Sequence, residues 1–166
     1  MSHRSALAAL SVVCAFSLGA LGGCRDTTSP SSSSIVGSWA TAPEDLQPNG
    51  WYEIRRAFTP IGTYRFEARM YGVYPGQPRN ELSAYSVIDG NYRVAGDSLF
   101  ETAHRETTWD RFYGANSPPT VRDIPDDYWS RSRSRFAVQG STLVLDYFSY
   151  PADAPVPTQM ILQRIQ

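Results

Sequence analysis

The sequence predicts an all-β domain, an antiparallel up-and-down meander that closes on itself as a small barrel. From residue 35 onward, short runs alternate apolar and polar residues with the period of two that half-buried strands show. Gly-containing turns separate these runs, and no convincing amphipathic helix interrupts them. Aromatic residues make up 13% of the chain, which also favours strands. Closure removes the exposed edges that an open sheet would present.

The expected strands follow one another at short intervals. They cover residues 35–39, 52–58, 63–71, 82–88, 92–94, 98–109, 131–138, 142–148 and 159–165. The segments 89–91 and 95–97 contain the Asp-Gly and Gly-Asp pairs that are typical of hairpin turns. The segment 110–130 lacks periodicity and contains three prolines. We therefore expect a long loop there, of a length often associated with function or mobility.

Residues 1–23 have the pattern of an export signal. A short positive segment with Arg4 precedes an apolar run over residues 6–18, and small residues close the segment. The apolar run is shorter than the roughly 20 residues that a membrane-spanning helix needs, which disfavours an uncleaved anchor helix. Residues 24–34 contain many serines and one proline but no aliphatic or aromatic side chain that could pack. We expect them to form a flexible tether that leads to a folded domain over residues 35–166.

The end of this signal resembles the lipobox of bacterial lipoproteins. Leu21-Gly22-Gly23-Cys24 has the aliphatic residue, two small residues and cysteine of that motif. The resemblance implies that the Cys24 thiol receives a diacylglycerol and that cleavage before Cys24 makes it the first mature residue. The membrane would then be a partner of the chain through lipidated Cys24. Arg25 follows the cysteine, which by the same resemblance favours the outer membrane of a Gram-negative envelope.

Composition excludes several classes of function. The chain has 15 basic residues, all arginine, against 16 acidic ones, and loss of the signal moves the net charge from −1 to −2, so nucleic acid is not an expected partner. Cys14 leaves with the signal and Cys24 carries lipid, so the domain lacks thiolates for catalysis or metal binding. We find no nucleophile elbow, phosphate loop or metal motif, and expect neither an enzyme, a metal site nor a cofactor.

The domain resembles a small lipocalin. Gly37-Ser38-Trp39 fits the Gly-x-Trp of the first lipocalin strand, and Arg164 lies on the last expected strand, where that family places an arginine across the tryptophan. The resemblance implies a lipocalin-like barrel in which Gly37, Trp39 and Arg164 form a structural latch between the two ends of the domain. A guanidinium over an indole is a favourable cation–π pair. The chain lacks the disulfide and C-terminal helix of true lipocalins.

Five side chains are candidates for ligand binding inside such a barrel: Tyr64, Phe66, Met70, Phe100 and His104. Ala68 shares the expected face of the first three. The alternative is that the apolar members are simply core, which is the usual fate of an apolar strand face. His104 and Glu106 could be a polar group inside the barrel or an exposed pair on an edge strand. Asp123, Asp126 and Asp127 lack the spacing of a calcium loop.

Two functions remain open on these residues. The first is a membrane-anchored lipocalin-like lipoprotein of the cell envelope that binds a small apolar or amphipathic ligand. The second is an envelope protein with a filled barrel that contacts a protein partner or cell-wall polymer through loops, especially residues 110–130. Arg131, Arg133 and Arg135 could touch phosphate headgroups or an anionic glycan, or form the solvated face of a strand.

Replacing Cys24 tests the anchor. Cys24→Ser should abolish incorporation of labelled palmitate and block the lipoprotein-type cleavage, because a hydroxyl does not form the thioether. Metabolic labelling followed by electrophoresis measures both effects. Continued labelling of the variant would show that the lipobox interpretation is wrong, and equal recovery in inner-membrane fractions would contradict the outer-membrane expectation.

Overall fold

The computed structural model describes residues 32–46, 49–127, 130–150 and 154–166. The expected signal peptide, Cys24 and the tether as far as residue 31 lie outside the described residues. No helix in the described part of the chain is long and apolar enough to cross a bilayer.

Eight antiparallel strands close into a barrel, which confirms the expected all-β architecture. The circuit runs β1-β10-β9-β8-β6-β5-β4-β3 and returns to β1, which pairs with both β10 and β3. The bounds are β1 Gly37–Ala40, β3 Gly50–Phe58, β4 Thr63–Tyr71, β5 Leu82–Ala95, β6 Ser98–Asp110, β8 Arg131–Gln139, β9 Thr142–Ser149 and β10 Val156–Ile165. Two short strands add to it, β2 Glu44–Leu46 beside β3 and β7 Thr120–Asp123 beside β6.

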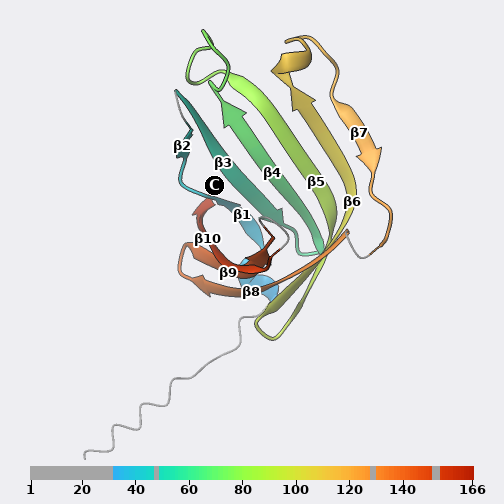
Figure 1. The fold of residues 1–166 in the computed structure, drawn as a ribbon. Helices are drawn as coiled ribbons and strands as arrows, with labels where there is room; N and C mark the ends of the chain where they lie inside the picture. Colours follow the sequence, from blue (N-terminus) through green and yellow to red (C-terminus); the bar gives the residue numbers. More distant parts are fainter. Residues whose placement is uncertain (1–31, 47–48, 128–129, 151–153) are drawn as a thin grey trace, which may run out of the picture.

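The barrel is closed only at one end of its long strands. β8 pairs with β6 over residues 98–102 of β6, and β1 pairs with β3 over residues 55–58 of β3. The remaining lengths of β3, β4, β5 and β6 continue beyond the closed part as a curved sheet, which β2 and β7 extend at its two sides (Figure 1). One end of the molecule is therefore a barrel, and the other end is an open, concave sheet.

Two short helical segments accompany the strands: α1 Ser32–Ile35 and the 3₁₀ helix η1 Arg111–Tyr113. The expected tether over residues 24–34 is too long, because residues 32–34 belong to α1. Ile35 is fully buried at the end of α1 rather than in the first strand. The expected loop 110–130 also needs correction, since it contains η1 and β7.

The predicted turn at Asp89-Gly90-Asn91 is wrong, because β5 runs through it without a break. The pairing of β5 with β6 shifts register between Asp89 and Gly90, which absorbs the irregularity inside the strand. A Cβ at Gly90 would lie 2.1 Å from the Thr102 carbonyl oxygen and 2.7 Å from a ring carbon of Tyr64. Glycine is therefore needed at position 90 because the Thr102 backbone and the Tyr64 ring approach this strand too closely for a side chain.

The apolar core fills the closed end. The fully buried side chains there include those of Trp39, Leu99, Leu143 and Leu162, and that of Phe58 is almost fully buried. The same cluster is completed by Ile35, Tyr64, Phe136 and Leu145. Because every strand of the barrel except β5 contributes a buried residue to this cluster and β5 packs partly buried side chains against it, the closed end is held from all sides.

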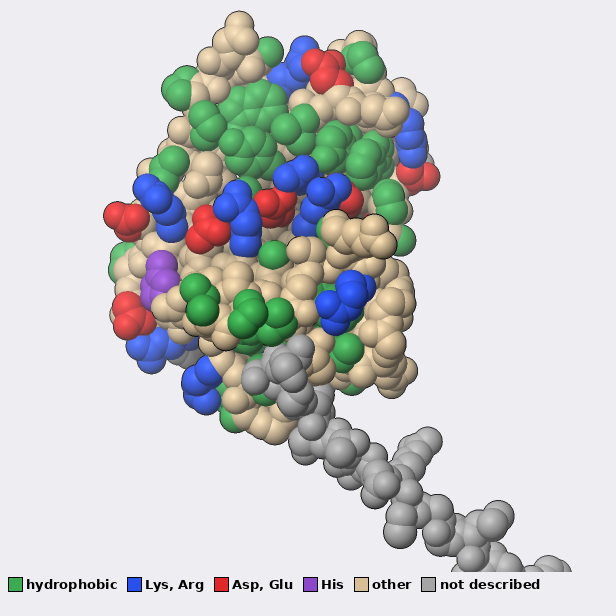
Figure 2. All heavy atoms as spheres, turned by 180° about the vertical axis from the view of Figure 1, so that it is seen from behind, with side chains coloured by type: hydrophobic (Ala, Val, Ile, Leu, Met, Phe, Trp, Pro, Cys, Tyr) green, Lys and Arg blue, Asp and Glu red, His purple; other side chains and the backbone are tan. Residues whose placement is uncertain are grey.

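The outer face of β3, β4 and β5 carries paired charges. Arg55 forms an ion pair with Glu53 at 2.7 Å. Glu67 forms ion pairs with Arg65 at 2.8 Å and with Arg69 at 2.6 Å. Figure 2 shows a belt of alternating basic and acidic side chains across the middle of one face, with hydrophobic side chains gathered beyond it. The arginines largely cover these carboxylates, because the side chains of Glu53 and Glu67 are only 9% and 14% exposed, so loss of an arginine would leave a shielded charge uncompensated. The arrangement of the pairs keeps this face close to neutral.

Trp39 and Arg164 meet where the two ends of the domain join. They are Cα partners in β1 and β10, and the Arg164 guanidinium carbon lies 4.1 Å from the centroid of the Trp39 ring. Arg164 also donates hydrogen bonds to the carbonyls of Val36 (2.9 Å) and Ser34 (3.2 Å), while the Trp39 indole donates to Ile35 at 2.8 Å. The predicted contact is present, and it also fastens α1 to the barrel.

Truncating the two partners should show that they are energetically coupled. We expect Trp39→Ala to cost about 3–5 kcal/mol of unfolding free energy, because it empties a fully buried site. Arg164→Ala should cost about 1–2 kcal/mol, and Arg164→Lys should restore little, since an ammonium cannot stack and reach two carbonyls. Chemical denaturation of both single variants and the double variant measures the coupling. Strictly additive losses would contradict it.

Candidate functional site

A buried ion pair lies above the apolar core in the barrel interior. Arg56 Nη1 lies 2.6 Å from Glu101 Oε1, and Ser132 donates a hydrogen bond of 3.3 Å to the other oxygen of Glu101. The guanidinium of Arg56 also lies over the ring of Phe66, at 5.1 Å. The side chain of Glu101 is only 6% exposed, so loss of Arg56 would leave an uncompensated buried charge. This pair marks the level at which the interior changes from apolar to polar.

A half-open cavity of about 380 Å³ lies on the concave sheet beyond this level. Its floor consists of the small side chains of Ala68, Ala84, Ser86 and Thr108. These residues face one another across β4, β5 and β6, because Ala68 pairs with Ser86 and Ser86 pairs with Thr108. Small residues at adjacent positions of neighbouring strands leave a hollow that large side chains would otherwise fill. Met70, Tyr113 and Pro118 form its walls.

The segment after β6 is fixed as one wall of the cavity. Asp110 caps η1 by accepting a hydrogen bond of 2.8 Å from the Phe112 backbone, and it also accepts one from the Tyr74 hydroxyl. Farther along, the Trp109 indole donates to the Ser117 carbonyl at 3.0 Å. The wall is therefore connected to the sheet at both its beginning and its end.

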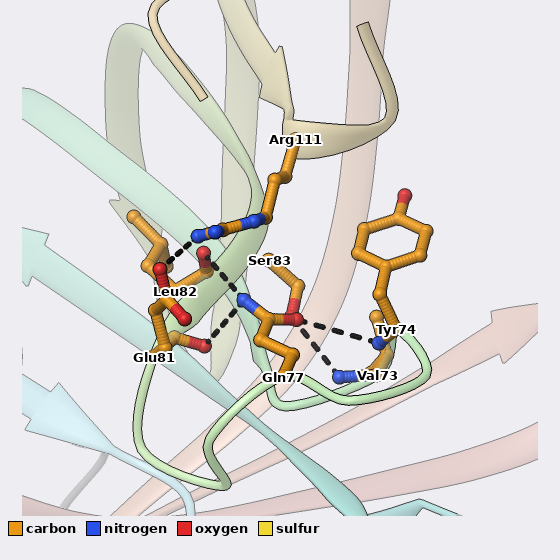
Figure 3. A network of polar contacts seen from close by, with 7 residues as sticks. All are labelled: Val73, Tyr74, Gln77, Glu81, Leu82, Ser83 and Arg111. Atoms are coloured by element: carbon orange, nitrogen blue, oxygen red, sulfur yellow. Dashed lines mark hydrogen bonds and ion pairs between the residues drawn. The ribbon is translucent and has the colours of Figure 1, made fainter. Parts of the chain in front are cut away.

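Gln77 organises the loop between β4 and β5, which forms the neighbouring rim (Figure 3). Its amide nitrogen donates to the carbonyls of Glu81 (3.2 Å) and Leu82 (3.1 Å). Its amide oxygen accepts from the Tyr74 backbone at 3.3 Å and from the Ser83 hydroxyl at 2.6 Å. A single side chain thereby satisfies polar groups on both sides of the loop.

Two further contacts complete the rim network. Ser83 is fully buried, and its hydroxyl accepts a hydrogen bond of 3.0 Å from the Val73 backbone. Arg111, the first residue of η1, forms an ion pair with Glu81, and Figure 3 shows its side chain reaching across to the β4–β5 loop. The loop and the η1 wall are thus joined to each other as well as to the sheet.

Polar groups gather near one side of the cavity. Ser86 donates a hydrogen bond of 3.3 Å to Glu106, whose other oxygen lies 2.5 Å from Arg122 of β7. The hydrogen bond to the Asp110 carboxylate, reinforced by burial, raises the pKa of Tyr74 above its ordinary value. The phenol therefore remains a donor at neutral pH, and Asp110 remains oriented along the cavity edge.

The structure separates the five predicted ligand-binding residues. Met70 lines the cavity, whereas Tyr64 is buried in the core and Phe66 packs against it. Burial also raises the pKa of Tyr64 far above its ordinary value. Phe100 and His104 project from the outer face, where Phe100 contacts arginines of the neighbouring strands and His104 lies 3.1 Å from the amide of Asn91. Those two residues are not brought together with the other three.

His104 and Glu106 do not share a face, although they are two residues apart. The register shift of β6 against β5 leaves His104 without a Cα partner, because Ala103 pairs with Gly90 and Arg105 pairs with Asp89. His104 is therefore exposed on the outer face, whereas Glu106 turns towards Ser86.

Of the three acidic residues considered for calcium, Asp126 forms an ion pair with Arg131 at 2.9 Å. Within the described ranges, no three His, Cys, Asp or Glu side chains are close enough together to hold a metal ion.

Several cavity residues had no signal in the sequence. Ala84, Ser86 and Thr108 look like ordinary strand residues, and only the register of β4, β5 and β6 places them side by side. Tyr113 and Pro118 fall in a segment without periodicity. No protein-family model matches the chain, and no curated protein matches it significantly. The fold and the cavity, together with the lipobox resemblance of residues 21–24, therefore carry the functional interpretation.

Replacing Gln77 should loosen the rim. Gln77→Leu keeps the side-chain volume but leaves two backbone carbonyls and one backbone amide without their partner, at a cost of about 1–3 kcal/mol. Hydrogen exchange of the amides in residues 73–83 should then become at least about tenfold faster. Gln139→Leu, at an exposed strand end, is the matched control and should change nothing there. Unchanged protection in the Gln77 variant would contradict the role assigned to its amide.

Proposed function

We propose that the protein binds a small amphipathic molecule in the cavity between the β4–β6 sheet and the η1 wall. The observation that carries this proposal is the cavity itself, whose volume of about 380 Å³ exceeds the roughly 300 Å³ at which small-molecule sites begin. Fixed walls and a connected rim support it further, because a preformed site needs little ordering when a ligand binds.

The lining favours a ligand with an apolar body and a polar end. Ala68, Met70 and Ala84 offer apolar surface, whereas Ser86 and Asp110 offer a hydroxyl and a carboxylate at the edge. Buried apolar contact supplies affinity, and a few placed polar groups fix orientation. A ligand end that donates hydrogen bonds suits the Asp110 carboxylate.

The proposed setting is the cell envelope, with the chain held to the membrane by lipidated Cys24. This part rests on the lipobox resemblance and on the Ser-rich segment between Cys24 and the domain. Two or three acyl chains anchor a protein stably, because each buried methylene contributes about 0.8 kcal/mol. The outer membrane is favoured if the envelope is Gram-negative.

A second candidate is an interaction protein that contacts a protein or cell-wall polymer through its loops. The packed closed end of the barrel favours it, since no ligand is needed to fill that part. Phe112 and Tyr113 favour it as well, because these large side chains are 76% and 78% exposed at the tip of η1.

Filling the cavity separates the two candidates. Native mass spectrometry of the detergent-purified chain should show a co-purified small molecule, and an amphipathic fluorescent dye should bind the ligand-free protein. Ala84→Phe should weaken dye binding at least about tenfold, the equivalent of roughly 1.4 kcal/mol of lost contact. Ala95→Phe adds the same ring at an exposed hairpin and should leave binding unchanged. Equal binding by both variants would exclude the cavity and favour the interaction protein.

A further inference from the structure

Phe100 is the centre of a cationic cluster on the outer face of the barrel. It lies on β6 between Arg93 of β5 and Arg133 of β8, its Cα partners in the two neighbouring strands. The guanidinium carbons of Arg93 and Arg133 lie 3.8 Å and 5.3 Å from the centroid of its ring. Cation–π attraction holds both cations beside one flat apolar ring. We call these three residues the Phe100 cluster.

The charge of the Phe100 cluster is not compensated by neighbouring acids. Two further arginines of β8 flank it and are both paired: Arg131 with Asp126 at 2.9 Å and Arg135 with Asp97 at 3.7 Å. Arg93 and Arg133 are exposed, and neither has a carboxylate within ion-pair distance in the described part of the chain. Among the described residues, Arg133 donates a hydrogen bond of 3.3 Å to the Ser98 hydroxyl and to no carboxylate. This contrasts with the belt on β3 and β4, where arginine and glutamate neutralise each other.

The Phe100 cluster lies at the end of the barrel where the described chain begins. Arg93 and Phe100 belong to the hairpin that joins β5 to β6, and α1 packs into the same closed end through Ile35 (Figure 1). The cavity lies at the opposite end of the same strands, near Met70 and Asp110. The end of the barrel at which the described chain begins therefore also carries the Phe100 cluster, and only the seven residues 25–31 separate Cys24 from α1.

We propose that the Phe100 cluster docks on the headgroups of anionic phospholipids. Guanidinium groups form bidentate hydrogen bonds with phosphate, and a flat aromatic ring between them is compatible with the interfacial region of a bilayer. The short link to Cys24 holds this face within reach of the membrane, where each arginine near an anionic surface strengthens association about fivefold. The choice of this partner rests on the proposed anchoring, whereas the contact itself does not require the acyl chains.

Vesicle partitioning tests the contact without the lipid anchor. The full chain carrying Cys24→Ser is mixed with vesicles of phosphatidylcholine alone or of phosphatidylcholine with phosphatidylglycerol, and co-sedimentation measures binding. Because Cys24→Ser keeps residues 1–23 on every variant, the readout is the ratio of binding to anionic over neutral vesicles. We expect this ratio to exceed one, and Arg93→Gln with Arg133→Gln should lower it by up to about thirtyfold. Arg65→Gln with Arg79→Gln removes the same charge from two exposed, paired arginines elsewhere and should have little effect. Melting temperatures check that both pairs fold.

Three outcomes would overturn the proposal. The first is equal binding of the Cys24→Ser chain to neutral and anionic vesicles. Preferential binding to anionic vesicles that persists when the salt concentration rises from about 0.1 M to about 1 M counts in the same way, because this rise shortens the Debye length from about 10 Å to about 3 Å. The second is an equal loss in the control pair. The third is complete displacement by inorganic phosphate at constant ionic strength, which would assign the cluster to a soluble phosphate. Because palmitate labelling tests Cys24 separately, failure of the anchor and failure of this contact are distinguishable.

Discussion

Closure of the barrel depends on one short strand and the contact that secures it. β1 has four residues and must pair with both β3 and β10, so few backbone hydrogen bonds hold the circuit together. The Trp39 ring fills the space behind this junction, and Arg164 covers it while binding two carbonyls near α1. Glycine is favoured at position 37, because a φ of +132° strains any other residue. A Cβ added there would also lie 2.4 Å from Arg164 Nη1 and would displace the guanidinium. The Trp39–Arg164 contact therefore supports the packing of the core, the closure of the barrel and the position of α1.

The concave end exists because β3, β4, β5 and β6 extend beyond the residues at which β1 and β8 close the barrel. Where β8 and β1 no longer pair with β6 and β3, small side chains on the inner face of β4 and β5 leave a cavity, and the segment after β6 lines one side of it. The Arg56–Glu101 pair lies at this transition and separates a packed interior from a hollow one. The packed core and the cavity thus occupy different levels along the same strands, so the structure contains the filled barrel that one functional hypothesis requires and the cavity that the other requires.

Alternation in the sequence predicted the inward face of β4 correctly, but it assigned Phe100 of β6 to the interior, where the structure places Leu99 and Glu101 instead, and it could not predict register. Tyr64, Phe66 and Met70 share the inner face as expected, and Gly37, Trp39 and Arg164 meet. The cavity depends on where Ala68, Ser86 and Thr108 fall relative to one another, which long-range pairing decides. The local sequence also predicted a turn at Asp89-Gly90-Asn91, whereas Gly90 lies within β5 and allows close packing against Tyr64 and Thr102. His104 was misplaced for a related reason, because an irregular register reverses the alternation.

The Gln77 network has a kinetic consequence. Its amide already satisfies both sides of the β4–β5 loop, and the Arg111–Glu81 pair fixes the facing wall, so side-chain contacts hold the described residues at the mouth of the cavity in place. If the cavity binds a ligand as proposed, entry and exit through its half-open mouth should need no gating step. The residence time of such a ligand should then depend on its own contacts with the lining rather than on the opening of a lid. Such a protein suits rapid local exchange at a surface better than long-distance carriage.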